Sequence, residues 1–190
     1  FTAEQLCDAV RFCHYSGVKV YVTLNTLVFD REIPLLAKAI ENCAKADVDA
    51  FIVQDMGVAR LARQIVPELP LHASTQMTVN SPEGAIMAKE LGFTRVVLGR
   101  ELSFAQIKAI TESCDIETEL FVHGALCVCI SGQCYMSSVL GGRSGNRGLC
   151  AQPCRLDFTS GDRHNVLSLK DLSLTEKLPE LAKAGITSVS

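Results

Sequence analysis

The chain has 190 residues, 48% of them hydrophobic, which is enough to bury a substantial core in one domain. A net charge of −3 and a pI near 5.8 exclude a generally basic, nucleic-acid-binding surface but leave room for a local basic patch. Because no apolar run approaches the roughly 20 residues of a membrane span and no leader pattern is seen, we expect a cytoplasmic protein without a membrane partner.

The first predicted element is a helix that begins at a capping box, Thr2 with Gln5, and stops at residues 16–17. Strands and helices then alternate, as β-branched apolar runs and apolar residues at helical spacing indicate. The predicted strands cover residues 18–23, 50–54, 71–74, 95–99, 117–123 and a stretch from 186. The further helices cover residues 31–46, 58–66, 103–111 and 174–184, with one more that begins at Ser81 and Pro82.

This βα repeat predicts a parallel sheet covered by helices. Either an open doubly wound sheet or a barrel would satisfy it. We favour an α/β fold of the (β/α)8 TIM-barrel type, because polar residues stand at most strand ends and these ends converge on one face of a barrel. The polar residues are Asn25, Gln54, Asp55, Ser74, Gln76, Arg100, Glu101 and His123.

Six strands are fewer than a full barrel needs, and the chain begins on a helix without methionine and stops inside a strand. We therefore expect a fragment with about six βα units, lacking about two N-terminal ones. The expected organisation is a single partial TIM-barrel catalytic domain over residues 1–190. It carries a cysteine-rich loop insertion at residues 124–166.

Residues 119–155 hold five of the nine cysteines and six of the thirteen glycines. A long excursion inside a compact domain is usually functional, and glycines let the backbone aim several side chains at one point. Cytosolic thiols stay reduced, so metal binding or catalysis is favoured over a disulfide scaffold. Simple packing is expected for the cysteines on apolar helix positions or at a helix end, namely Cys7, Cys13, Cys43 and Cys114.

Four of the loop cysteines, Cys127, Cys134, Cys150 and Cys154, offer the number of thiolates that a 4Fe-4S cluster takes. Soft sulfur ligands select iron–sulfur, zinc or copper(I), and a zinc ion with four cysteines is the competing interpretation. Zinc loops more often show two CxxC knuckles, which this loop lacks. A redox-active or unliganded thiol set is the third interpretation.

Glu119 and His123 share one face of their predicted strand, because alternate residues point the same way. The histidine suits acid–base work or a substrate contact, and a structural histidine bonded to a backbone carbonyl is the alternative. A buried Glu119 needs a partner, for which Arg100 is the candidate and a structural ion pair the simpler role.

Residues 119–137 follow the pattern Glu-x-Phe-x-x-Gly-Ala-Leu-Cys-x4-Gly-x-Cys-x-Met-Ser. This resembles, without a mismatch, the signature of the collagenase-like peptidase family, unassigned peptidase family 32. The similarity extends to residues 18–30, 141–155 and 167–174, so it covers essentially the whole chain. It implies a TIM barrel whose full members begin with two further βα units.

The resemblance implies two kinds of function. Some members are described as collagen-degrading peptidases. Others support oxygen-independent hydroxylation of a tRNA uridine, a 23S rRNA cytidine or a ubiquinone precursor, with cysteine-bound 4Fe-4S clusters and prephenate as the implied oxygen donor. The NRGxCAQPCR sequence looks closest to the ribosomal RNA branch.

The resemblance also bears on the ligands. Members often carry a cysteine where this chain has Ser173. Cys127, Cys134 and Cys150 are thus the implied ligands, with Cys154 as our choice for the fourth. Cys129 and Ser173 are the alternatives at that position.

The leading hypothesis is an iron–sulfur enzyme that hydroxylates a pyrimidine in RNA, with rRNA favoured over tRNA. A peptidase acting on a peptide substrate is the alternative, although no GxSxG or HExxH motif is present. Hydroxylation of a quinone precursor and a non-catalytic binding module are the others. Glu119, His123 and His72 would handle protons. The expected substrate-binding residues, with arginines suited to anions, are Arg143, Arg147, Arg155, Arg100, Asn25 and Gln76.

Overall fold

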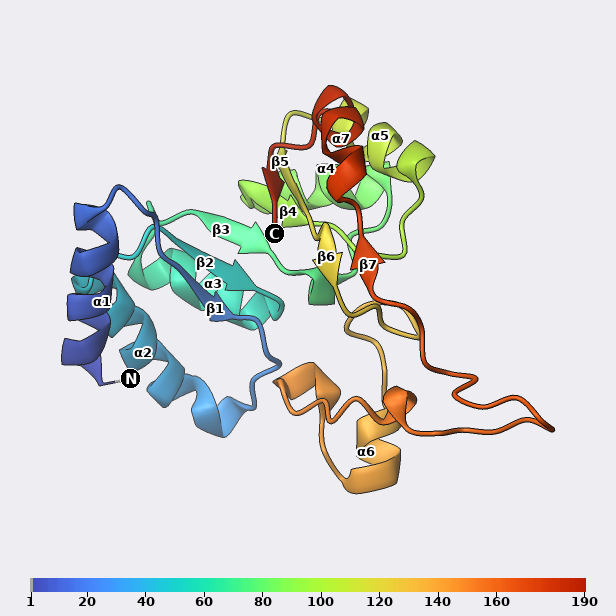
Figure 1. The fold of residues 1–190 in the computed structure, drawn as a ribbon. Coiled ribbons are helices and arrows are strands. Elements are labelled where there is room, and N and C mark those ends of the chain that lie inside the picture. Colours follow the sequence, from blue (N-terminus) through green and yellow to red (C-terminus); the bar gives the residue numbers. More distant parts are fainter. Residues whose placement is uncertain (1) are drawn as a thin grey trace. The chain divides into compact units, whose positions relative to one another are not determined.

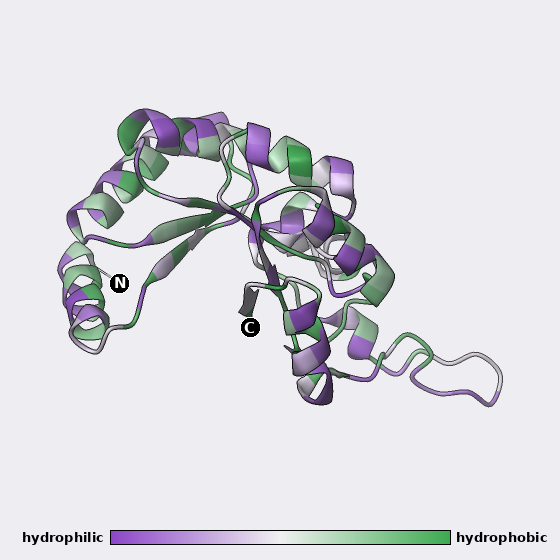
Figure 2. Ribbon diagram, turned by 90° about the horizontal axis from the view of Figure 1, so that it is seen from above, coloured by the Kyte–Doolittle hydropathy of each residue, from purple (hydrophilic) through white to green (hydrophobic). Residues whose placement is uncertain are grey.

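A computed structural model describes residues 2–190, and the chain divides into two compact units, residues 1–73 and 74–190. In each unit strands alternate with helices along the chain (Figure 1). The strands of the first unit are largely hydrophobic, whereas its helices carry both hydrophobic and hydrophilic residues (Figure 2). This is the pattern of a parallel sheet covered by amphipathic helices.

The first unit contains a parallel sheet in the order β1-β2-β3. Its elements are α1 (Ala3–Tyr15), β1 (Tyr21–Leu24), α2 (Ile33–Lys45), β2 (Ala50–Val53), α3 (Met56–Ile65) and β3 (Leu71–Ala73). The predicted capping box is confirmed, because Thr2 and Gln5 exchange side-chain and backbone hydrogen bonds at the start of α1. Phe51, Ile40 and Val58 are fully buried and form part of the core.

The second unit contains a parallel sheet in the order β4-β5-β8. Its regular elements are α4 (Pro82–Glu90), β4 (Arg95–Val97), α5 (Phe104–Ser113), β5 (Glu117–Leu120), α7 (Leu178–Lys183) and β8 (Ser188–Val189). A short 3-10 turn, Thr75–Met77, precedes α4. Val96, Ile110 and Leu120 lie in its core. The prediction of an α/β fold with parallel strands is confirmed.

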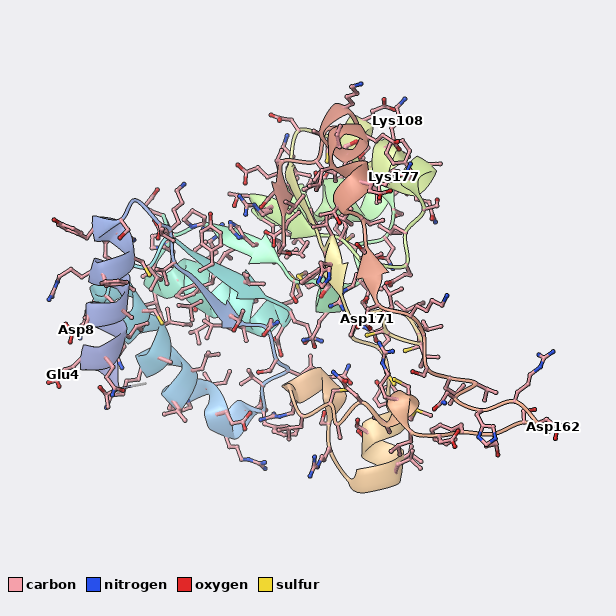
Figure 3. The ribbon with its side chains drawn as sticks, viewed as in Figure 1. Glu4, Asp8, Lys108, Asp162, Asp171 and Lys177 are labelled. Carbon is pink, nitrogen blue, oxygen red and sulfur yellow. The ribbon has the colours of Figure 1, made fainter. Side chains whose placement is uncertain are left out.

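The long excursion of the second unit leaves and returns through a two-stranded antiparallel ladder, β6 (His123–Gly124) and β7 (Leu172–Ser173) (Figure 1). Between them lie α6 (Met136–Gly141) and the 3-10 turns Gly145–Arg147 and Pro153–Arg155. Asp162 lies at the far tip of the excursion and Asp171 at its return (Figure 3). The ladder therefore closes the base of the excursion.

Two predicted boundaries are corrected. The strand expected over residues 117–123 ends at Leu120, and His123 pairs instead with Ser173 of β7, because Val122 already bonds Ser190 and Leu174. The helix expected from residue 174 begins at Leu178, after a 3-10 turn. The second shift is consistent with a proline in the first helical turn.

Candidate functional site

A pocket of about 180 Å³ in the second unit is the candidate site, and we call it the cysteine pocket. Three of the four predicted metal ligands line it, together with two of the predicted substrate-binding residues. The lining residues are Thr75, Gln76, Arg100, Cys127, Ser131, Gly132, Cys134, Gly145 and Cys150. The pocket thus combines thiols with one cation and one carboxamide.

Two cysteine sulfurs of this pocket accept hydrogen bonds from the backbone. The N–H of Met136 donates to Sγ of Cys134 and the N–H of Gln152 donates to Sγ of Cys150, each at a distance of 3.4 Å. The buried hydroxyl of Ser137 lies 3.8 Å from the same Cys150 sulfur. Donors aimed at sulfur favour the thiolate over the thiol, and hydrogen bonds of this kind tune iron–sulfur clusters.

Two further loop cysteines lie near enough to Cys127 for their charge to affect the pKa of its thiol. Burial raises the pKa of its thiol, the Arg100 guanidinium opposes this, and negative charge on Cys150 and Cys154 raises the pKa again. Arg100 also donates to the carbonyl of Ala125 and lies 4.3 Å above the Phe121 ring. Because metal ligands must be thiolates, a raised thiol pKa opposes binding until a cation supplies the compensating charge.

Glu101 fixes the middle of the cysteine loop. Its carboxylate accepts the Ser131 N–H at 3.0 Å and the Ser131 hydroxyl at 2.8 Å. Burial acts to raise the pKa of Glu101, but these two hydrogen bonds and the Arg100 charge hold it below its ordinary value. The sequence identifies Glu101 only as a polar residue at a strand end, because nothing in the local pattern points to Ser131, which lies 30 positions away.

The neighbouring residues are fixed in the same way. The Gln133 carboxamide donates to Oγ1 of Thr78 at 2.8 Å, and Asn146 donates to the carbonyl of Gly132. Gly132 has φ +79°, and a Cβ there would lie 2.8 Å from Cα of Gln76. Only glycine fits this approach, which gives a physical reason for the glycine in the signature pattern.

The fourth ligand has three candidates. Cys154 is half-buried in the turn Pro153–Arg155. Cys129 is exposed, and its pKa is raised to about 11 by burial, by the charge of Cys134 and by a hydrogen bond with Cys134. The Ser173 hydroxyl lies 3.2 Å from that of Thr175. The structure thus brings Cys129 close to Cys134, which spacing in the sequence did not indicate.

Within residues 2–190, no three His, Cys, Asp or Glu side chains group so as to hold one metal ion. The thiolates that bind a 4Fe-4S cluster lie farther apart than the ligands of a single metal ion, because each thiolate binds a different iron. The donor chemistry of the cysteine pocket fits such a cluster, since thiols and N–H donors to sulfur are both present.

The three residues expected to handle protons lie in different surroundings. Glu119 pairs with Arg95 at 3.1 Å, and both side chains are only 12% exposed. The expectation that Arg100 would pair with it is wrong, because the neighbouring strand β4 places Arg95 at Glu117 and Glu119. His123 is exposed on β6.

In the first unit, His72 is buried on β3 with its ring 4.8 Å from the Tyr21 ring, and Asn25 follows β1. Of these two residues, only Asn25 is predicted from its place at a strand end; His72 lies within its predicted strand and is expected to handle protons.

The loop arginines also differ from one another. Arg155 bonds Asp171 at 2.8 Å, Ser168 and the carbonyl of Leu169, so it ties the return of the excursion to its middle. Arg147 belongs to the turn Gly145–Arg147. Arg143 is exposed and lines a second pocket of the excursion.

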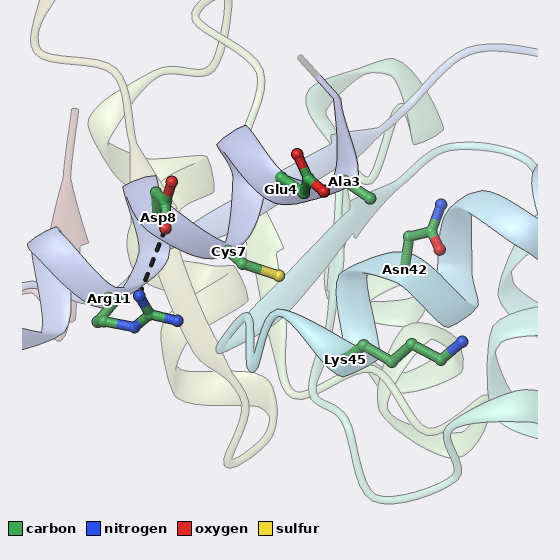
Figure 4. Close-up of a pocket in the computed structure, with 7 residues that line it drawn as sticks. All are labelled: Ala3, Glu4, Cys7, Asp8, Arg11, Asn42 and Lys45. Atoms are coloured by element: carbon green, nitrogen blue, oxygen red, sulfur yellow. Dashed lines mark hydrogen bonds and ion pairs between the residues drawn. The ribbon is translucent and has the colours of Figure 1, made fainter.

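A further groove of about 420 Å³ lies between α1 and α2 of the first unit (Figure 4). Cys7 lines it beside side chains of both charge signs, including the exposed pair Asp8 and Arg11 at 3.4 Å. Mixed, exposed charges give it no preference for one ligand class. Among residues 2–190, no helix combines the length and apolar character needed to cross a bilayer.

Comparison with known proteins gives a consistent family. The sequence pattern described as "Peptidase family U32" matches residues 1–190. The chain is 42% identical over 193 residues to the 23S rRNA 5-hydroxycytidine C2501 synthase of Escherichia coli, covering 97% of this chain and 29% of that protein. It is 34% identical to tRNA hydroxylation protein P1 of Bacillus subtilis, covering 100% and 48%.

A protein of Porphyromonas gingivalis named Collagenase is 32% identical, covering 98% of this chain and 49% of that protein. The chain therefore spans about half the length, or less, of these curated relatives. A solved structure of a U32 peptidase shares the fold, with a TM-score of 0.62 and 17% identity over 97% of this chain and 73% of that one. Since the family pattern matches it from end to end, the chain belongs to peptidase family U32.

Proposed function

We propose that this chain carries the cluster-binding part of an RNA hydroxylase that modifies a pyrimidine without molecular oxygen, with ribosomal RNA as the preferred substrate. The observation that carries the proposal is the cysteine pocket, where three thiols, two sulfur-directed N–H donors and a guanidinium lie together. Relatives named as rRNA and tRNA hydroxylation proteins support the reaction class.

Cys127, Cys134, Cys150 and Cys154 would hold a 4Fe-4S cluster, which would supply electron transfer or substrate activation. The protein's own contribution is to fix the thiols through Glu101 and Gly132 and to keep positive charge beside them through Arg100. Prephenate is the proposed oxygen donor, as the family resemblance implies.

Gln76 is the residue suited to orient a base in this pocket. Its side-chain oxygen is buried and accepts no hydrogen bond from any residue in 2–190. A buried acceptor without a donor is costly, so a ligand that supplies an N–H is favoured there. The amino or imino N–H of a pyrimidine meets that requirement.

A peptidase is the second candidate, favoured by the relative named Collagenase. A cysteine peptidase needs a histidine within hydrogen-bond reach of its nucleophile. Among residues 2–190, Cys129, Cys134 and Cys150 bond backbone groups, Ser137 or one another, and none of the five loop cysteines bonds a histidine. The arrangement therefore favours redox chemistry over peptide hydrolysis.

The test has two stages. Anaerobically purified protein should contain about four irons and matching sulfide per chain, whereas stoichiometric zinc in colourless protein would reject the cluster. In a strain lacking the gene, the full-length protein should then restore hydroxylated pyrimidine in digested rRNA, as measured by mass spectrometry, and the Cys134→Ala variant should not. Modification restored in tRNA alone would reject the preference for rRNA. Unchanged RNA, together with gelatin cleavage that the Cys134→Ala variant loses, would assign the function to the peptidase.

A further inference from the structure

A second pocket of the excursion has a different character from the cysteine pocket, and we call it the outer pocket. Its volume is about 350 Å³, within the range of pockets that bind small molecules. Its walls are mostly apolar, with a single cation. The lining residues are Ser137, Leu140, Gly141, Arg143, Ala151, Pro153 and Leu156.

Arg143 brings a charge that the rest of the described chain does not neutralise. Its backbone is held in place, since its N–H bonds the Ser137 carbonyl and its carbonyl accepts from Ser138. Its guanidinium, by contrast, makes no hydrogen bond or ion pair with any residue in 2–190. The guanidinium of Arg155, by comparison, forms an ion pair with Asp171.

The two pockets share a wall. Ser137 and Ala151 line the outer pocket, and the Ser137 hydroxyl, which accepts the Ala151 N–H at 3.1 Å, lies 3.8 Å from the Cys150 sulfur of the cysteine pocket. The Ser137 side of the outer pocket therefore adjoins the Cys150 side of the cysteine pocket.

We propose that the outer pocket binds one nucleotide of the RNA substrate next to the nucleotide that reacts. The base would lie against Leu140, Pro153 and Leu156, and the phosphate would bind Arg143. This inference rests on the proposed RNA function. An apolar wall with one unpaired guanidinium is complementary to a flat base attached to a single negative charge, and a planar guanidinium binds phosphate through paired hydrogen bonds.

Phosphate binding by Arg143 is tested by fluorescence anisotropy titrations of the protein with labelled single-stranded RNA across a salt series. Arg143→Ala should weaken binding about fivefold at low salt and reduce the salt slope by about 0.7, the value of one phosphate contact in a single strand. Arg163→Ala is the matched control, because Arg163 is an exposed cation of the same excursion near its tip, and should change neither quantity.

The base is tested with RNAs that each lack one base. At one position, base removal should weaken binding to the wild-type protein about fivefold. The same removal should have no further effect on Leu156→Ala, which should fold normally because Leu156 is exposed. Iron content and thermal unfolding of the variants should match the wild type.

The outcomes separate the two hypotheses. If wild-type protein binds RNA and Arg143→Ala binds it equally well, the outer pocket is wrong while the proposed function stands. If Arg143→Ala weakens binding but Leu156→Ala responds to every missing base as the wild type does, the base site is wrong. If the wild-type protein binds no RNA at all, the proposed function itself fails.

Discussion

Glu101 and Ser131 are joined by two hydrogen bonds on one carboxylate, from the backbone N–H at 3.0 Å and from the hydroxyl at 2.8 Å. Ser131 is buried and stands between Cys127 and Cys134 in the chain. This contact therefore holds the cysteine loop against the segment between strand β4 and helix α5.

Glu101→Ala should free this part of the loop. Two buried Ser131 donors would lose their acceptor, at a cost of about 1–3 kcal/mol each. We expect a lower free energy of unfolding, less iron per chain after reconstitution, and faster alkylation of the loop thiols in the apoprotein. Glu112→Ala, which removes an exposed carboxylate paired with Lys108 on α5, is the control. Equal alkylation rates for the two variants would contradict this role of Glu101.

The same contact predicts a dependence on pH in the apoprotein. The pKa of Glu101 is held below its ordinary value of 4.5, so the folded state binds this proton less readily than the unfolded state. Its stabilisation is therefore complete above about pH 4.5 and is lost as the pH falls through the lower folded value. Urea titrations from pH 7 to 3 should show a steeper loss for the wild type than for Glu101→Gln. Parallel curves would count against the coupling.

Alanine substitutions at Gly132 and Gly148 distinguish the cost of a left-handed backbone from the cost of a close contact. Both have positive φ, +79° and +75°, but a Cβ at Gly132 meets Cα of Gln76 at 2.8 Å, whereas a Cβ at Gly148 meets nothing within 4 Å. Gly148→Ala should cost about 1 kcal/mol for the left-handed backbone. Gly132→Ala should cost clearly more and should lower iron content, because Gln76 or the loop must shift. Similar unfolding free energies for both would remove the close approach as a cause.

The sequence predicts local features of this chain correctly but does not predict contacts between residues that are far apart in the sequence. Helix starts such as Thr2 and Ser81 depend on neighbours a few positions away, and both caps were predicted correctly. The loop thiols were predicted from their spacing and resemblance. The partner of Glu119 was predicted wrongly, because strand register decides between Arg95 and Arg100 and no local pattern encodes it. The closeness of Cys129 to Cys134 depends likewise on a turn that the sequence does not specify.

Cysteine replacements test the ligand set. Cys127→Ala, Cys134→Ala and Cys150→Ala should each abolish cluster binding, because these thiols line one pocket. Cys43→Ala is the control, since Cys43 is buried in the first unit on α2. Iron and sulfide analysis of anaerobic protein provides the measurement.

The fourth ligand is decided by the same assay. Cys154→Ala should lose the full cluster, whereas Cys129→Ala should keep it. The reverse result would assign the fourth position to Cys129, which lies beside Cys134.

Glu119 and Glu117 provide a matched pair for the last prediction, because both bond Arg95, at 3.1 and 2.7 Å, but the Glu119 side chain is only 12% exposed whereas that of Glu117 is 54% exposed. Removing one member of a buried ion pair leaves an uncompensated charge and costs about 3–5 kcal/mol, whereas an exposed pair contributes up to about 1 kcal/mol. Arg95 keeps Glu117 in the Glu119→Gln variant, so we expect a loss of about 2 kcal/mol or more for Glu119→Gln and less for Glu117→Gln, measured by urea unfolding.

The same pair separates the two roles of Glu119. If it acts only through Arg95, RNA hydroxylation per folded, iron-loaded molecule should be equal in both variants. A specific activity that falls only in Glu119→Gln, with a changed pH profile, would instead support the proton-handling role predicted from the sequence.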